Sequence, residues 1–170
     1  MNFLKIETHE LLEKIHSEIY SRINFKLTDL TFEEESAEYN ACKFYLNNLK
    51  IISRDSKITP KKIGQFVTFW KRRKNGEIEP FHLNDIFDHL IINCRKEDLV
   101  GQFVFPKAAL VQNGIISTKN KDGKRAFRLY PSWDSPKSKQ AIQSQNWQLK
   151  YFFMIDDKID LLKLQKSFEV

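Results

Sequence analysis

The sequence predicts an α+β domain in which a central mixed β-sheet is flanked by helices. Apolar residues recur at helical spacing near both ends of the chain, and short segments rich in β-branched and aromatic residues lie between them. No internal repeat or low-complexity linker divides the 170 residues, a length typical of one domain. We therefore expect a single domain over 1–170, with an N-terminal helix in 1–30, a core over 31–153 and a C-terminal helix in 154–170.

Two helices are predicted near the N-terminus. The first covers 6–23, because apolar residues recur there at helical spacing, at Ile6, Leu11, Leu12, Ile15, Ile19 and Ile23. The second runs from 31 to 41, because Thr31 followed three residues later by Glu34 forms a capping-box pattern.

The middle of the chain predicts strands. Segments 43–46 and 50–53 flank Asn47-Asn48 and form a hairpin pattern. Segment 65–70 is rich in β-branched and aromatic residues, and 88–94 is almost wholly apolar, as in a buried strand. We expect 101–105 to pair with it.

The remaining elements alternate between helix and strand. Pro106 opens a short helix over 107–111, and strands are expected at 115–117 and 126–130. Helices are expected over 135–147 and 159–168.

Composition excludes several classes of protein. Two cysteines, Cys42 and Cys94, are too few for a disulfide scaffold or a cysteine-ligated zinc site. No apolar run approaches the roughly 20 residues of a membrane span, and the first residues lack the apolar stretch of a signal peptide. A cytoplasmic protein with no membrane partner is expected, and nothing indicates its oligomeric state.

Charge is unevenly distributed along the chain. Residues 1–39 carry four basic and nine acidic groups, whereas 50–74 carry nine basic groups and one acid. Residues 119–139 add seven basic groups and two acids. Two basic windows in a chain of net charge +6 indicate an anionic partner.

Several sequence blocks resemble the MepB-like family. They are Glu35-Ser36-Ala37-Glu38-Tyr39, Ser56 to Val67, Phe69-Trp70-Lys71-Arg72, Gly101 to Lys107, Gly123-Lys124-Arg125-Ala126, Tyr130-Pro131-Ser132-Trp133 and Gln145-Asn146-Trp147-Gln148. Together they cover about residues 33 to 153. The family is named after a gene beside a multidrug efflux pump and its repressor, so the resemblance implies a setting in drug response and supplies no catalytic residues.

The order of the predicted elements from Glu35 onward also resembles the core of the PD-(D/E)XK nucleases, the restriction-endonuclease-like fold. That chemistry needs an acid at the start of the second core strand. It also needs an acid and a lysine two residues apart on the third, so that both project from one face. The acids hold Mg²⁺ against the phosphate, and the lysine helps to position or activate water.

The expected catalytic positions are incomplete. Asp88 stands where the first acid belongs, Glu35 or Glu38 can supply the helix acid, and Gln102 occupies the position of the second acid. Val104 stands where the lysine belongs, and Lys107 would have to replace it from the following helix. We therefore expect a nuclease-like core without catalysis and without a cofactor. A Mg²⁺-dependent nuclease with a migrated lysine is the alternative.

Aromatic side chains beside cations indicate nucleic-acid binding, because bases stack on rings and phosphates pair with basic groups. The leading prediction is binding of single-stranded DNA or RNA in one groove near Asp88. A protein-interaction or drug-sensing module remains a third possibility. The predicted contacts are Arg54, Lys57, Lys61, Lys62, Lys71, Arg72, Lys124, Arg125 and Arg128 for phosphates, and Trp70 and Trp133 for bases.

Overall fold

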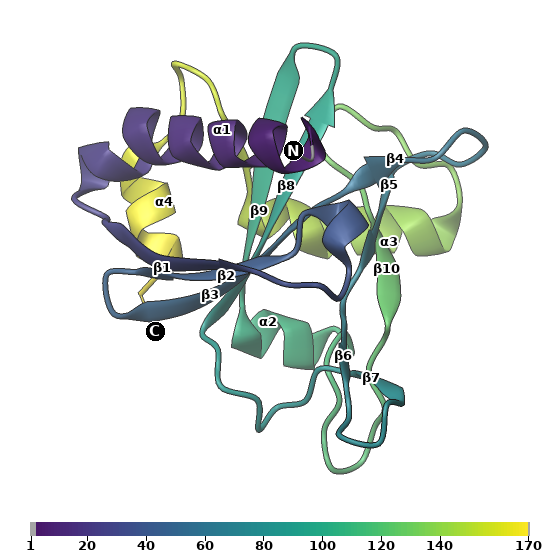
Figure 1. Cartoon of the computed structure of the whole chain (residues 1–170). Helices are drawn as coiled ribbons and strands as arrows, with labels where there is room; N and C mark the ends of the chain where they lie inside the picture. The colour runs from purple at the N-terminus through teal and green to yellow at the C-terminus, as the bar shows by residue number, and fades with distance from the viewer. Residues whose placement is uncertain (1–2, 170) are drawn as a thin grey trace.

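A computed structural model describes residues 3–169, with side chains from residue 11 onward. Its centre is a six-stranded mixed sheet of order β1-β2-β3-β8-β9-β11 (Figure 1). The strands are β1 (Leu27–Phe32), β2 (Cys42–Leu46), β3 (Leu49–Asp55), β8 (His89–Lys96), β9 (Leu99–Pro106) and β11 (Phe152–Met154). The predicted α+β fold with a central mixed sheet and flanking helices is confirmed.

One parallel pair makes the sheet mixed. β3 and β8 run parallel, and the other neighbours in the sheet are antiparallel. The connection between β3 and β8 carries strands of two smaller sheets. The first has the order β10-β5-β4 and consists of β4 (Lys57–Ile58), β5 (Gln65–Thr68) and β10 (Ala126–Leu129), which comes later in the chain. The second pairs β6 (Trp70–Arg72) with β7 (Ile78–Pro80).

Helices cover both faces of the central sheet (Figure 1). α1 (Phe3–Glu18), the 3₁₀ turn η1 (Tyr20–Ile23) and α4 (Leu161–Ser167) pack on one face. α2 (Lys107–Gln112), α3 (Lys139–Gln148) and η3 (Leu149–Tyr151) pack on the other, together with the β10-β5-β4 sheet. Among residues 3–169, no helix has both the length and the apolar character needed to cross a membrane.

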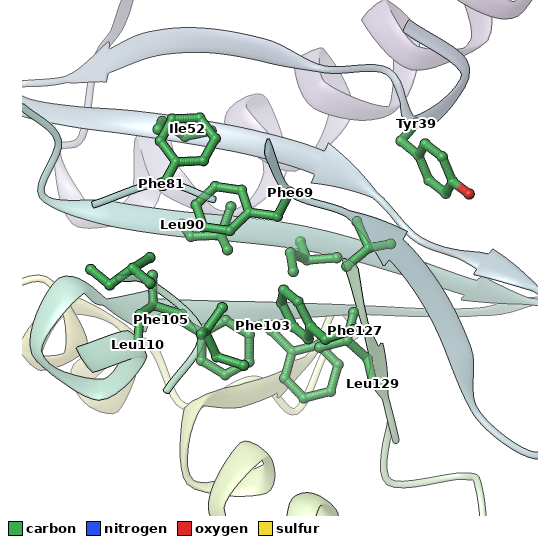
Figure 2. Packing of buried hydrophobic residues seen from close by; sticks show 14 of the residues in the cluster. Tyr39, Ile52, Phe69, Phe81, Leu90, Phe103, Phe105, Leu110, Phe127 and Leu129 are labelled. Carbon is green, nitrogen blue, oxygen red and sulfur yellow. The ribbon is translucent and has the colours of Figure 1, made fainter. Parts of the chain in front are cut away.

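The two hydrophobic cores follow from strand alternation. Successive side chains point to opposite faces of a strand, so Ile51 joins the core under α1 while Ile52 joins the other. On β9, Val104 faces α1, and Phe103 and Phe105 face the opposite core. Figure 2 shows this second core, which also holds the stacked rings of Phe69 and Phe81.

Two predicted elements differ from the structure, and some strands were not predicted. The helix expected over 31–41 is wrong: β1 ends at Phe32, and the chain then turns through η2 (Ala37–Tyr39). Ser36 and Asn40 on either side of η2 have φ angles of 57° and 51°, and left-handed residues interrupt an α-helix. Residues 115–117 form an isolated bridge at Ser117 and no strand. β1, β4, β7 and β11 were not predicted.

The other predicted elements are present within a few residues of their expected bounds. The N-terminal helix, the 43–53 hairpin, the apolar strand after Asp88, its partner and the later helices all occur. The predicted place of the Ile6 side chain lies outside the described side chains.

Candidate nucleic-acid interface

The predicted catalytic residues do not meet. The carboxylate of Asp88 accepts the backbone N–H of Lys50 over 2.7 Å, and this bond fastens the start of β8 to the start of β3. Gln102 lies on β9 opposite Asn93, so it belongs to a different part of the sheet. Glu38 is exposed on η2. Asp88 thus lies at the Lys50 end of β3, whereas Lys57 follows the Asp55 end, so Lys57 is not part of a groove near Asp88.

Lys107 does not take the place of a catalytic lysine. Its ammonium donates to the backbone carbonyl of Asp85 and lies 4.8 Å from the centre of the Phe87 ring. The migrated-lysine arrangement, with Asp88, Gln102 and Lys107 in one site, is absent from this geometry.

A polar row crosses the central sheet at Gln102, and two of its members, Asp55 and Asn93, were not predicted from the sequence. Asp55, Asn93 and Gln102 are register partners on β3, β8 and β9. Asn93 Nδ2 donates to Asp55 Oδ1 over 2.9 Å, and Gln102 Nε2 donates to Asn93 Oδ1 over 2.8 Å. Tyr20 closes the row by donating its hydroxyl to Gln102, and Asn40 Nδ2 donates to Asp55 Oδ2 over 3.0 Å.

This row surrounds one carboxylate with amides. Burial raises the pKa of Asp55 above its ordinary value, and the hydrogen bonds from Asn40 and Asn93 and the charge of Arg95 oppose that rise. Among the residues described, no group of three or more His, Cys, Asp or Glu side chains is placed to hold a metal ion. A metal site at Asp55 would need further carboxylates beside it, and the side chains that contact Asp55 are the amides of Asn40 and Asn93.

Asp55 also stands two residues before Lys57, which is the acid–lysine spacing of the nuclease motif that was expected on 101–105. The signal was present in the sequence, at the end of the 50–53 strand. Lys57, however, is exposed and lies with its ammonium 4.7 Å from the centre of the Tyr39 ring.

Three predicted phosphate ligands are already engaged within the fold. Arg54 is 1% exposed and pairs with Glu33 over 2.9 Å, so the prediction that it contacts phosphate is wrong. Arg72 pairs with Glu35 over 2.9 Å. Its hydrogen bond and charge lower the pKa of Glu35.

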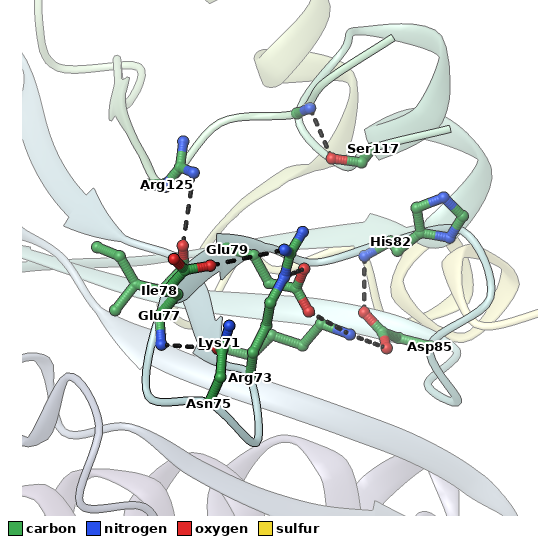
Figure 3. Close-up of polar contacts among 11 residues, drawn as sticks. Lys71, Arg73, Asn75, Glu77, Ile78, Glu79, His82, Asp85, Ser117 and Arg125 are labelled. Carbon is green, nitrogen blue, oxygen red and sulfur yellow. Dashed lines mark hydrogen bonds and ion pairs between the residues drawn. The ribbon is translucent and has the colours of Figure 1, made fainter. Parts of the chain in front are cut away.

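Lys71 is the third engaged cation. It pairs with Asp85 over 2.5 Å and with Glu79 over 3.5 Å (Figure 3). Partial burial lowers the pKa of Lys71. The carboxylates of Asp85 and Glu79 together raise that pKa by more, so it lies above the ordinary value. Residues 50–74 are therefore less basic at the surface than their composition indicates.

A second group of cations lies around the partly exposed ring of Phe66 on the β10-β5-β4 sheet. Phe66 on β5 is the register partner of both Lys57 on β4 and Arg128 on β10, so the three side chains share one face. Tyr39 packs edge-to-face on Phe66, with ring centres 6.3 Å apart. Lys61 and Lys62 are exposed in the connection between β4 and β5. We call these six residues the basic–aromatic face: Tyr39, Lys57, Lys61, Lys62, Phe66 and Arg128.

Arg128 fixes the connection between β4 and β5, which we call the 59–64 loop. Its Nη2 donates to Thr59 Oγ1 over 2.8 Å and to the carbonyls of Gly64, Ile63 and Lys62 over 3.0, 3.1 and 3.3 Å. A hollow of about 430 Å³ lies between this loop and Phe66. Arg128 therefore positions Lys61 and Lys62 as well as contributing charge.

Lys124 and Arg125 lie at the other end of β10. Arg125 donates to the carbonyl of Ile78 over 3.5 Å (Figure 3). Lys124 borders a separate hollow of about 320 Å³ against α3. Of the 119–139 cations, Arg128 therefore lies beside the 50–74 cations, whereas Lys124 and Arg125 lie apart from them.

The tryptophans contribute less open surface than predicted. Trp133 is partly buried against Phe152, with ring centres 5.6 Å apart, and its indole nitrogen is buried without a partner among the residues described. Trp70 is partly buried, and the guanidinium of Arg72 lies 5.3 Å from its ring centre. The aromatic ring among these cations is that of Phe66. Side chains of 65–70 alternate between the two faces of the strand, so Phe66 points outward while Val67 and Phe69 are buried.

Comparison with known proteins assigns the chain to a family. The model of the MepB-like family matches residues 33–154. The chain belongs to the MepB-like family. A solved structure titled "Crystal Structure of MepB" is 38% identical, with a TM-score of 0.77, and the match covers 89% of this chain and 98% of that one. The family match includes η2, the 59–64 loop and β10, which carry the basic–aromatic face.

A second solved structure is more distant. It is a bacterial homing endonuclease, I-Ssp6803I, at 15% identity and a TM-score of 0.44, with 88% of this chain and 87% of that one covered. No curated protein matches the chain.

Proposed function

We propose that this MepB-like chain binds single-stranded nucleic acid along the basic–aromatic face and does not cleave it. The observation that carries the proposal is the cross-strand row Lys57–Phe66–Arg128, with Lys61 and Lys62 beside it. A base stacks on an exposed ring, and lysines on either side pair with its phosphates. A cytoplasmic location and a part in drug response belong to the same proposal.

The form of the face favours single strands. Bases are available for stacking only where they are not paired, and Phe66 is partly exposed in a hollow. Reading a duplex by sequence requires an element that enters the major groove. The elements beside Phe66 are a short sheet and a loop, which supply cations and stacking surface.

The hydrogen-bond donors around Asp55 favour binding without cleavage. Mg²⁺ prefers hard oxygen ligands in an octahedron, usually from one or two carboxylates plus substrate. Both oxygens of Asp55 accept amide N–H groups, from Asn93 and Asn40. The alternative, a nuclease that uses Asp55 and Lys57, predicts Mg²⁺-dependent cleavage of a labelled strand that Asp55→Ala abolishes, and our proposal predicts an intact strand for both proteins.

Binding is tested by fluorescence anisotropy with a labelled single-stranded oligonucleotide. The double variant Lys57→Glu/Lys62→Glu should weaken binding by at least about tenfold, since each lost or reversed phosphate contact contributes of the order of 1 kcal/mol. The matched control is Lys14→Glu/Lys163→Glu, on α1 and α4, which makes the same change in net charge. Equal losses from the two pairs would mean attraction by net charge alone, and no binding by the wild type would refute the proposal.

The protein-interaction alternative is separated by the same assay. If an acidic polypeptide displaces the oligonucleotide and binds more tightly, the basic–aromatic face serves a protein partner.

A further inference from the structure

The 59–64 loop stands between two hollows. The hollow of about 430 Å³ opens onto the basic–aromatic face and is bordered by Phe66 and Arg128. A second hollow, of about 320 Å³, lies on the other side of the loop and is bordered by Lys96 and Asp134. Pro60, Lys61 and Lys62 border both, so the tip of the loop separates two places where a chain can lie.

Exposed apolar side chains also flank the tip of the loop. Ile58 and Ile63 are 56% and 43% exposed, and they flank Pro60, Lys61 and Lys62. Figure 1 shows the segment after β4 extending away from the body of the fold. In nucleic-acid-binding proteins, exposed Ile and Pro side chains on such projections enter between neighbouring bases and unstack them.

A wedge must keep its shape, and this loop is braced at its base. Arg128 binds three of its carbonyls and the Thr59 hydroxyl. Gly64 has φ of +87°, and a Cβ atom there would lie 2.6 Å from the carbonyl oxygen of Leu129. Pro60 restricts the backbone further.

We propose that the 59–64 loop, with Ile58 beside it, is a wedge that recognises the junction between a duplex and its two single strands. One strand leaves along the basic–aromatic face, past Phe66, and its complement passes through the second hollow. In that hollow Lys96 pairs with Asp134 over 3.3 Å, so the positive charge of Lys96 offsets the negative charge of the Asp134 carboxylate. The inference rests on the proposed binding of nucleic acid and adds the class of substrate.

The test compares three oligonucleotides of equal total length: a single strand, a blunt duplex, and a forked duplex with two unpaired arms. Each is made as DNA and as RNA, which distinguishes the two sources. The full chain should bind the fork about tenfold more tightly than the single strand, a difference of roughly 1.4 kcal/mol. 2-Aminopurine placed at the junction should brighten on binding, because unstacking relieves its quenching.

The wedge variant is Ile58→Ala/Ile63→Ala. It should bind the single strand within about twofold of the wild type and lose the preference for the fork, since only the inserted apolar atoms are removed. The control is Ile142→Ala/Leu162→Ala, two side chains that are 41% and 62% exposed on α3 and α4. It should keep the preference.

Two results would overturn the wedge and leave the proposed function standing. One is equal affinity of the wild type for fork and single strand, and the other is an unchanged fork preference in the Ile58→Ala/Ile63→Ala variant. Failure to bind any of the three oligonucleotides would refute the proposed function itself.

Discussion

The side-chain amide of Asn93 on β8 donates to the carboxylate of Asp55 on β3 over 2.9 Å, at directly opposed positions of the parallel pair. The contact ties together the two strands that make the sheet mixed. Asn93 is 4% exposed, so its amide has little access to water that would replace this partner.

Asp55→Ala should therefore lower the free energy of unfolding by about 1–3 kcal/mol, because it leaves the buried amide of Asn93 without an acceptor. Urea denaturation followed by circular dichroism measures the change. Asp98→Ala, at an exposed turn position, is the control and should shift stability by less than about 0.5 kcal/mol. Equal effects of the two substitutions would contradict a structural role for the polar row.

The stability of the fold should fall in mild acid because of His89. The His89 side chain is buried, its Nε2 bonds to the carbonyl of Ser167 over 3.0 Å, and its Nδ1 has no partner among the residues described. Burial lowers its pKa below the ordinary value of 6.5, although the Ser167 carbonyl and Asp88 oppose this shift. The neutral ring thus stabilises the fold above the unfolded-state pKa, and that stability is lost as pH falls through the folded-state pKa.

Urea midpoints measured from pH 7.5 down to pH 5 test this behaviour. His89→Gln should remove a part of the slope that is at most about 1.4 kcal/mol per pH unit, the limit for one proton. Asn84→Gln, at an exposed position without a titratable group, should keep the wild-type slope. A slope unaffected by His89→Gln would assign the acid sensitivity to other groups.

Arg128 should protect the 59–64 loop from proteolysis. Arg128→Ala removes its hydrogen bonds to Thr59, Lys62, Ile63 and Gly64, so the loop opens more often. Trypsin cleavage after Lys61 and Lys62, followed by mass spectrometry under native conditions, should become several-fold faster. Arg125→Ala removes one 3.5 Å bond to Ile78 and should leave the rate unchanged.

Glu35→Gln should strengthen the binding of single-stranded nucleic acid. The substitution releases Arg72, which pairs with Glu35 over 2.9 Å beside the Trp70 ring, and it removes a negative charge close to β6. We expect an improvement of about two- to fivefold in anisotropy titrations at low salt, which disappears at high salt because the attraction is screened. Glu34→Gln, at an exposed neighbouring position, is the matched charge control and should have a smaller effect.

The salt dependence of binding should report the number of phosphate contacts. For single strands, each contact contributes roughly 0.7 to the slope of log affinity against log salt concentration. Lys57→Glu/Lys62→Glu should reduce that slope by about 1.4 if both lysines touch phosphates, whereas Lys14→Glu/Lys163→Glu should leave it unchanged. A slope near zero for the wild type would argue against phosphate contacts altogether.

Much of the fold is readable from the sequence because its strands and helices have strong periodicity. The apolar segment after Asp88 and the Asn47-Asn48 turn each specify their element locally. The predicted helix over 31–41 failed because Ser36 and Asn40 adopt left-handed backbone conformations. The capping-box pattern gives no information about such tertiary constraints.

The candidate site was only partly predictable. Lys57, Lys61 and Lys62 from the 50–74 window lie beside Arg128 from the 119–139 window. Arg54 also lies in the 50–74 window, but it is buried. Charge counts do not reveal which cation pairs inside the fold, and the pairing of Arg54 with Glu33 joins residues 21 positions apart. Phe66 was not predicted as a contact for a related reason, because its exposure depends on which face of β5 the rest of the fold covers.

The parallel pairing of β3 with β8 has a consequence for the order of folding. Asp55 and Asn93 lie 38 positions apart, so a long loop must close before this pair forms, whereas the β2–β3 and β8–β9 hairpins close locally. Loop closure over many residues slows the formation of non-local contacts. The chain between the two strands holds β4, β5 and the 59–64 loop, and β5 is completed by the still later β10. During synthesis, the basic–aromatic face is therefore assembled only after most of the chain has emerged.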